Sequence, residues 1–143
     1  MAAAIATQAA AGDALALRAE SCGTRALVGD PAEPAAQQAV AEIGLTVAPH
    51  CARQITREMA LDAALVVALT GLHRAQLKVL GPDVAERVIS FGDVTGLGDI
   101  PDPYGASPDV YRCVRDMLVD GMPAVLAEFK ARIARSANKT QTP

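Results

Sequence analysis

Two short stretches of this 143-residue chain combine residue types that could act on a phosphate group. In the first, HCARQITR, Cys51 stands six positions before Arg57. This C-x5-R spacing can place a thiolate nucleophile and a guanidinium around one phosphate. In the second, GDIPDPYGAS, Asp102 offers a carboxylate for proton transfer, and Tyr104 offers an aromatic ring that could flank a planar substrate.

The residues around Cys51 argue against a phosphate-binding loop. Such a loop needs several converging backbone N–H groups, so it favours small residues between a strand and the start of a helix. The stretch instead has no glycine, follows Pro49, and places Glu58 directly after Arg57, where its charge would repel a phosphate. Neither a helix dipole nor a cation is placed to turn Cys51 into a thiolate. We therefore expect a small buried cysteine beside a solvated arginine.

The Asp-Pro-Tyr-Gly stretch has a local conformation that its proline dictates. Pro103 holds the preceding Asp102 in an extended conformation, with the ring of Tyr104 beside it. Taken alone, such a tetrapeptide is usually only a turn. Its meaning depends on the elements that position it.

The composition indicates one folded domain and excludes several classes of protein. With 51% hydrophobic and 20% charged residues and a net charge of −3, the chain is globular rather than disordered. It has no basic stripe or aromatic platform for nucleic acid, and no apolar run near 18 residues that could span a membrane. The three cysteines form no C-x-x-C pair, which disfavours a disulfide framework or a zinc site and favours a reducing cytosol.

Strand and helix patterns alternate along the chain. The apolar run ALVVAL (64–69) is typical of a strand buried on both faces, LALRAES (15–21) alternates like a half-exposed strand, and RVISF (87–91) is a third candidate. Residues 92–106 are expected to form a loop. Alternating elements of this kind favour an α/β sandwich with a parallel sheet. Helices are expected at 1–11, from Pro34 to Gly44, at 57–62 after the N-cap Thr56, at 71–80, and from Ser107 onward.

Four segments taken in order resemble the low-molecular-weight protein tyrosine phosphatases. They are ESCGTRALVGDPAEPAAQQAVAEIGL, HCARQIT, ALVVALTGLHRAQL and DIPDPYGASPDVYRCV. The resemblance covers residues 1–136 and leaves 137–143 as an expected disordered tail. It implies a doubly wound three-layer sandwich whose four parallel strands have the order 2-1-3-4. It also implies phosphotyrosine hydrolysis through a cysteinyl-phosphate intermediate, without metal or other cofactor.

The resemblance assigns roles to four residues. Asp102 matches the general acid that protonates the leaving phenolate oxygen and later activates water. Tyr104 matches an aromatic wall of the substrate crevice. Ser21 and His50 match polar residues that form hydrogen bonds to the phosphate loop and hold its shape.

Two further residues of the shared segments are expected to have no part in the chemistry. Arg53 is expected to be a solvated surface arginine. Tyr111 resembles the family tyrosine at the base of the last helix, where a packing role is expected.

One part of the family pattern has no match in this chain. Family members open with a strand and a C-x5-R-(S/T)-P loop, followed at once by Met or Ile, Ala and the first helix. MAAAIATQ at the start of this chain lines up with the residues directly after that loop. The central first strand, the nucleophilic cysteine and the phosphate-binding arginine are therefore expected to lie outside these residues, and the chain by itself is expected to be inactive.

Three functions remain open. The first is a cytoplasmic phosphatase acting on a phosphotyrosine protein or a small aryl phosphate, with its true start upstream or its gene truncated. The second is a pseudo-phosphatase that binds a partner without chemistry. The third, arsenate reduction, needs resolving cysteines after the third strand, and residues 70–100 contain none.

Overall fold

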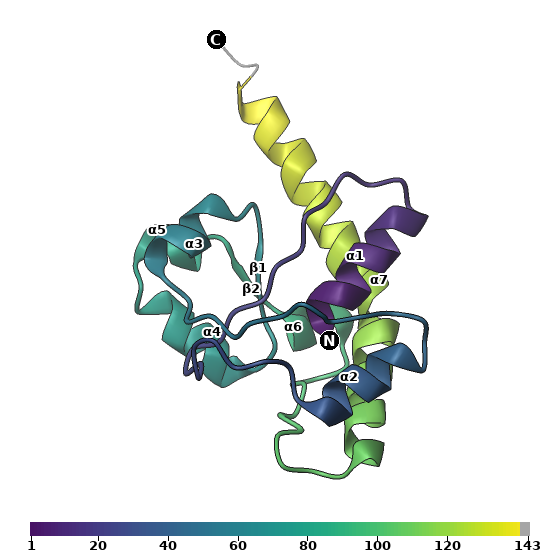
Figure 1. Cartoon of the computed structure of the whole chain (residues 1–143). Helices are drawn as coiled ribbons and strands as arrows, with labels where there is room; N and C mark the ends of the chain where they lie inside the picture. The colour runs from purple at the N-terminus through teal and green to yellow at the C-terminus, as the bar shows by residue number, and fades with distance from the viewer. Residues whose placement is uncertain (141–143) are drawn as a thin grey trace.

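The computed structural model describes residues 1–140 and has a small parallel sheet at its centre (Figure 1). Strand β1 (Val66–Ala68) pairs with β2 (Val88–Ser90). Parallel neighbours need a crossover, and here the chain returns through α4 (Gly71–Lys78) and α5 (Pro82–Ala85). Both strands were predicted from their apolar runs and are confirmed.

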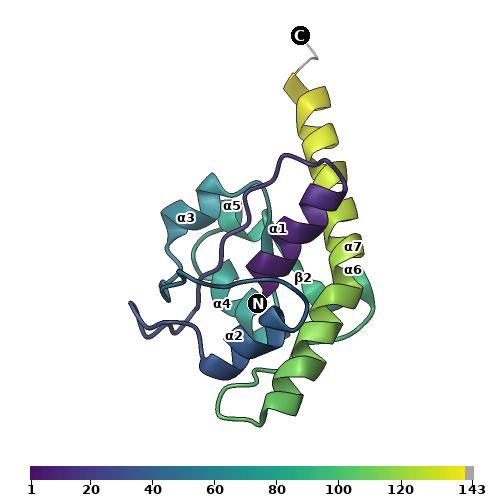
Figure 2. The ribbon, with the colours of Figure 1, turned by 45° about the vertical axis from the view of Figure 1, so that its right-hand side comes forward.

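Helices lie on both faces of the sheet (Figures 1 and 2). On one side α7 contacts α1, α2 and α6, whereas on the other α5 contacts α3 and α4. This layering agrees with the expected α/β sandwich. The remaining helices are α1 (Ala2–Gly12), α2 (Pro34–Ala41), α3 (Arg57–Asp62), α6 (Phe91–Thr95) and α7 (Pro108–Thr140).

Strand β1 separates two apolar clusters. Val67 and Leu69 pack against the cluster built from α1, α6 and α7, whereas Val66 and Ala68 belong to the cluster around α3, α4 and α5. This alternation follows from the two-residue period of a strand. Val66 and Val67 are only half-buried, so the prediction of a strand fully buried on both faces is wrong at these positions.

Local sequence signals fix several helix starts. The Thr56 hydroxyl accepts a hydrogen bond from the Met59 N–H (3.2 Å), so the predicted N-cap of α3 is confirmed. Thr70 caps α4 in the same way through the His73 N–H (3.1 Å). Helices α2, α5 and α7 each begin at a proline, whose missing N–H costs nothing at that position.

The expected strand at residues 15–21 does not form. The segment runs without regular structure, and only Gly23 makes an isolated parallel bridge, with Gln54. A strand needs a neighbour to satisfy its backbone groups, and none pairs with this segment among residues 1–140. Within residues 1–140, β1 pairs with β2 on one edge and has no strand neighbour on the other edge. Of the four parallel strands expected, this part of the chain therefore forms one pair.

Two further boundaries differ from the predictions. Residues 91–95, at the start of the expected loop, form the short helix α6, which ends at Gly96 in the left-handed conformation (φ 73°). The expected tail from residue 137 is helical as far as Thr140, because no proline or glycine interrupts α7 between Pro123 and Pro143. Residues 141–143 lie outside the described residues.

A cluster of charges holds α2 against α7. Arg115, only 9% exposed, donates to the Ala39 carbonyl (3.0 Å) and to the Glu42 carboxylate (2.8 Å). Arg112 contacts the same carboxylate (2.8 Å), and its hydrogen bond is the main reason that the pKa of Glu42 is lowered. These contacts fix the helix whose first turn carries part of the pocket described next.

Candidate active site

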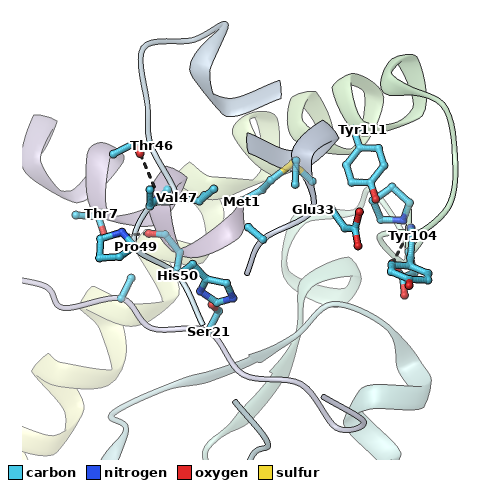
Figure 3. A pocket seen from close by; sticks show the side chains of 18 residues that line it. Met1, Thr7, Ser21, Glu33, Thr46, Val47, Pro49, His50, Tyr104 and Tyr111 are labelled. Atoms are coloured by element: carbon cyan, nitrogen blue, oxygen red, sulfur yellow. Dashed lines mark hydrogen bonds between the residues drawn. The ribbon is translucent and has the colours of Figure 1, made fainter. Parts of the chain in front are cut away.

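One pocket of about 440 Å³ brings together the four site residues expected from the sequence (Figure 3). Ser21, His50, Asp102 and Tyr104 all line it, although they come from three separate parts of the chain. Met1, at the start of α1, also lines this pocket. The structure thus places the predicted acid, ring and supporting residues around one space.

Asp102 lies in a turn that its own carboxylate helps to close. The Asp102 Oδ1 atom accepts a hydrogen bond from the Tyr104 N–H (3.1 Å), and the Ala106 N–H donates to the Pro103 carbonyl (2.9 Å). Gly105 has a positive φ of 74°, a conformation that glycine adopts without steric cost. The Asp102 side chain is therefore fixed at the pocket while remaining exposed to solvent.

The two tyrosines of the pocket differ in exposure. Tyr104 is 68% exposed and stands as an open wall, whereas Tyr111 is 4% exposed and packs at the start of α7, as predicted. Burial raises the pKa of Tyr111, and the charges of Glu33 and Asp102 raise it further. A hydrogen bond with the Gly105 backbone acts in the opposite direction and links Tyr111 to the turn that carries Asp102.

Ser21 and His50 reach the pocket from two segments that pair with each other. The Gly23 N–H donates to the Arg53 carbonyl (2.8 Å), and the Ile55 N–H donates to the Gly23 carbonyl (2.9 Å). Both Ser21 and His50 are half-buried. The pairing therefore brings both side chains to the same pocket although the sequence separates them by 28 residues.

Arg53 lies at the surface, as expected, but its guanidinium also contacts the neighbouring segment. Its Nη2 atom donates to the Ser21 carbonyl (3.0 Å), and its Nη1 atom forms an ion pair with Glu20 (3.0 Å). The side chain is 43% exposed and lies across the neighbouring segment. Arg53 thus fastens the backbone next to Ser21, a role that spacing alone did not reveal.

The backbone of the C-x5-R stretch is not arranged to bind an anion. The Ala52 N–H donates to the Asp30 carbonyl (2.8 Å), and the Ile55 N–H donates to Gly23. A phosphate cradle requires converging N–H groups that point at the ligand. Here two of the N–H groups are already used by the protein's own carbonyls, which agrees with the rejection of this motif.

The side chains of the same stretch point to the same conclusion. Arg57 donates through Nε to the Leu80 carbonyl (3.1 Å) and forms an ion pair with Asp83, so it joins α3 to α5. Cys51 is exposed rather than buried as expected, because its short segment runs along the surface. Neither Cys51 nor Arg57 lines the pocket that holds Asp102.

The pocket has an incomplete set of groups for phosphate transfer. No cysteine, lysine or arginine side chain is among the described residues that line it. The Met1 amino group lies at the pocket, and burial lowers its pKa. Within the part of the chain that the structure describes, no three His, Cys, Asp or Glu residues lie together in a group that could hold a metal ion.

Glu33 also lines the pocket and was missed at the sequence level. It occupies the N-cap position of α2, where a polar residue is expected for reasons of helix capping alone. The sequence held one hint that Glu33 does more than cap the helix. Glutamate has a longer side chain than Ser, Thr, Asp and Asn, which are the residues that cap helices best.

Comparison with known proteins places this fold and pocket in a defined family. The family described as low molecular weight phosphotyrosine protein phosphatase matches residues 1–136. The chain belongs to this family, whose members are phosphoric monoester hydrolases.

Relatives and solved structures support the assignment. The protein-tyrosine-phosphatase Wzb of Escherichia coli K12 is 35% identical over 102 residues, which is 71% of this chain and 69% of Wzb. The phosphatase Etp of the same organism is 33% identical over the same shares. A structure of the arginine phosphatase YwlE is 28% identical with a TM-score of 0.83, covering 90% of this chain and 86% of YwlE. A tyrosine phosphatase from T. tengcongensis is 26% identical with the same TM-score, covering 89% and 88%.

Across residues 1–140, every helix is too short or too polar to traverse a lipid bilayer.

Proposed function

We propose that residues 1–143 form the acid-bearing part of a site that hydrolyses phosphotyrosine monoesters. The observation that carries this proposal is the shared pocket of Asp102, Tyr104, Ser21 and His50. Spacing along the chain does not bring these four residues together, whereas the fold does. Family membership supplies the reaction class.

Asp102 is the proton donor in this proposal. Cleavage of the P–O bond leaves negative charge on the phenolate oxygen, and a carboxylic acid beside that oxygen supplies the proton. The resulting carboxylate then takes a proton from the water that attacks the phosphoenzyme. The turn around Asp102 suits both steps, because it holds the side chain at the pocket and open to solvent.

Tyr104, Ser21 and His50 serve binding rather than proton transfer. The exposed ring of Tyr104 offers a flat apolar wall for an aryl group. Ser21 and His50 lie on the paired segments 21–23 and 50–55 and offer hydrogen bonds to a phosphate loop. The substrates that fit are phosphotyrosine in a protein and small aryl phosphates. We place the protein in the cytosol, where its three free thiols would stay reduced.

Hydrolysis also requires a nucleophile and a cation that the pocket side chains do not supply. In the family these belong to the C-x5-R-(S/T)-P loop. We propose that such a loop acts from a segment before Met1. The alternative is a pseudo-phosphatase, in which the same pocket binds a phosphoprotein partner without turnover.

A two-protein comparison tests the proposal. Residues 1–143 are compared with the same residues preceded by the strand and C-x5-R-(S/T)-P loop of a family member, using p-nitrophenyl phosphate. We expect no turnover from 1–143 and steady turnover from the extended protein, abolished when the added cysteine is replaced by serine. A fully folded extended protein that binds phosphate but shows no turnover would favour the pseudo-phosphatase.

A thermal melt of the same two proteins checks that the added segment docks. Strand β1 has one edge without a strand partner in the described chain. A strand of about 5–6 residues would add backbone hydrogen bonds worth about 1 kcal/mol each. We therefore expect the melting temperature of the extended protein to be higher by about 10 °C or more. Equal melting temperatures would show that the segment remains undocked.

A further inference from the structure

Glu33 is a pocket residue whose carboxylate has no internal partner. As the N-cap residue of α2 it makes no side-chain hydrogen bond to the helix. Among the side chains that the structure describes, those of residues 1–138, the Glu33 carboxylate forms neither an ion pair nor a hydrogen bond with another side chain. The side chain is exposed at the pocket. A charged group without an internal partner at a substrate pocket is available to a ligand.

The surroundings of Glu33 are aromatic and acidic. Figure 3 shows its carboxylate on the side of the pocket where Tyr104 and Tyr111 lie, away from His50. The Glu33 and Asp102 charges both act on the Tyr111 hydroxyl, so the two carboxylates lie near the same ring. This side of the pocket therefore combines two aromatic rings with two carboxylates.

Positive groups are few around this pocket. Among its described lining residues there is no lysine or arginine side chain. Anionic side chains of a substrate would meet the Glu33 carboxylate at the pocket. Cationic side chains would gain Coulomb attraction to Glu33 and contact with the exposed ring of Tyr104.

We propose that Glu33 selects substrates that carry a cationic side chain next to the phosphorylated residue. The ligand class is a phosphotyrosine peptide with lysine or arginine on either side of the phosphotyrosine. This inference rests on the function proposed above, since it names the substrate class of the same pocket. Phosphate recognition itself is left to the C-x5-R-(S/T)-P loop proposed above.

The size of the effect follows from the exposure of Glu33. Two unit charges about 4 Å apart in water attract with about 1 kcal/mol, which corresponds to roughly a fivefold change in an equilibrium constant. Salt screens such exposed charges, with a Debye length of about 3 Å at 1 M ionic strength. A preference of about fivefold that disappears at high salt is therefore the expected signature.

The first experiment measures kcat/KM of the extended protein for two phosphotyrosine peptides. The peptides differ only in having lysine or glutamate on both sides of the phosphotyrosine. We expect the lysine peptide to be preferred about fivefold at low salt. Glu33→Gln should bring the ratio of the two kcat/KM values close to one. Equal values for both peptides in the unmodified protein would overturn the inference.

A matched variant separates a local effect from a change in net charge. Asp62→Asn removes the same charge from an exposed residue at the end of α3, outside the pocket lining. We expect it to leave the peptide preference unchanged. A preference that falls equally in Asp62→Asn and Glu33→Gln would assign the effect to the overall field and overturn the role of Glu33.

A binding measurement on residues 1–143 tests the preference of Glu33 for a cationic ligand independently of turnover. Tyramine serves as an aryl cation and 4-hydroxyphenylacetate as its anionic counterpart, each titrated by NMR. We expect tyramine to shift the Glu33 and Tyr104 signals and to bind about fivefold more weakly to Glu33→Gln. Equal affinity for both probes would overturn the inference. Turnover of p-nitrophenyl phosphate by the extended protein reports on the proposed function separately, so the two can fail independently.

Discussion

Residues 50–57 and residues 98–107 both carry spacings suited to phosphate chemistry, but the structure treats them in opposite ways. In the first, Ala52 and Ile55 use their N–H groups on the chain's own carbonyls, and Arg57 joins two helices. In the second, a turn closed by Asp102 leaves its carboxylate at a pocket. The difference teaches that a motif acts only where its groups remain available to a ligand.

His50 belongs to the first stretch, residues 50–57, but lines the same pocket as Asp102 of the second. It directly precedes Cys51 yet lines the pocket, whereas Cys51 does not. One position along the chain thus separates a pocket residue from a surface thiol. The segment thus contributes to the candidate site through His50 and Arg53, and not through the C-x5-R pair.

The largest expected effect concerns Asp102. In the extended protein, Asp102→Asn should lower kcat about 10²–10⁴-fold for a substrate with a poor leaving group, because the departing phenolate then receives no proton. Steady-state kinetics with a series of aryl phosphates would show a smaller loss as the leaving group improves. Asp62→Asn serves as the surface control. A mutant as active as the unmodified protein towards the poorest leaving group would remove Asp102 from the mechanism.

Much of this fold could be predicted because its signals are local. The cap Thr56, the opening proline of α2 and the apolar runs of β1 and β2 act over a few residues, and all were identified. The strand predicted at residues 15–21 does not form, because a strand depends on a neighbour that no local pattern reveals. Helices α5 and α6 were missed because four or five residues give too little periodicity.

The candidate site likewise contains residues that the sequence revealed and residues whose roles only the fold revealed. Asp102 and Tyr104 stand in one recognisable tetrapeptide, and family resemblance added Ser21 and His50. The contact between Arg53 and the Ser21 carbonyl joins residues 32 positions apart, so only the folded chain shows it. Glu33 was hidden because an N-cap position already explains a polar residue there.

A smaller effect is expected from the start of α3. Thr56→Ala should lower the free energy of unfolding by about 1 kcal/mol, because the Met59 N–H loses the hydroxyl that caps it. Urea unfolding followed by circular dichroism would measure the change. Thr56→Ser retains the acceptor and should lose much less. If Thr56→Ala instead reduced turnover strongly with unchanged stability, the stretch would have a catalytic role and the contrast with residues 98–107 would fail.

The smallest expected effects on hydrolysis are those of Cys51→Ser and Arg57→Ala. Arg57 is 48% exposed in its ion pair with Asp83, so its loss should lower the free energy of unfolding by about 1 kcal/mol or less. Turnover by the extended protein should change less than about twofold in both variants, since neither side chain reaches the pocket. Asp83→Asn breaks the same ion pair from the other side and should give a similar small loss of stability. Kinetics and urea melts of the three variants would measure both quantities. A 100-fold or greater loss of turnover in Cys51→Ser or Arg57→Ala, without loss of structure, would show that residues 50–57 bind the phosphate after all.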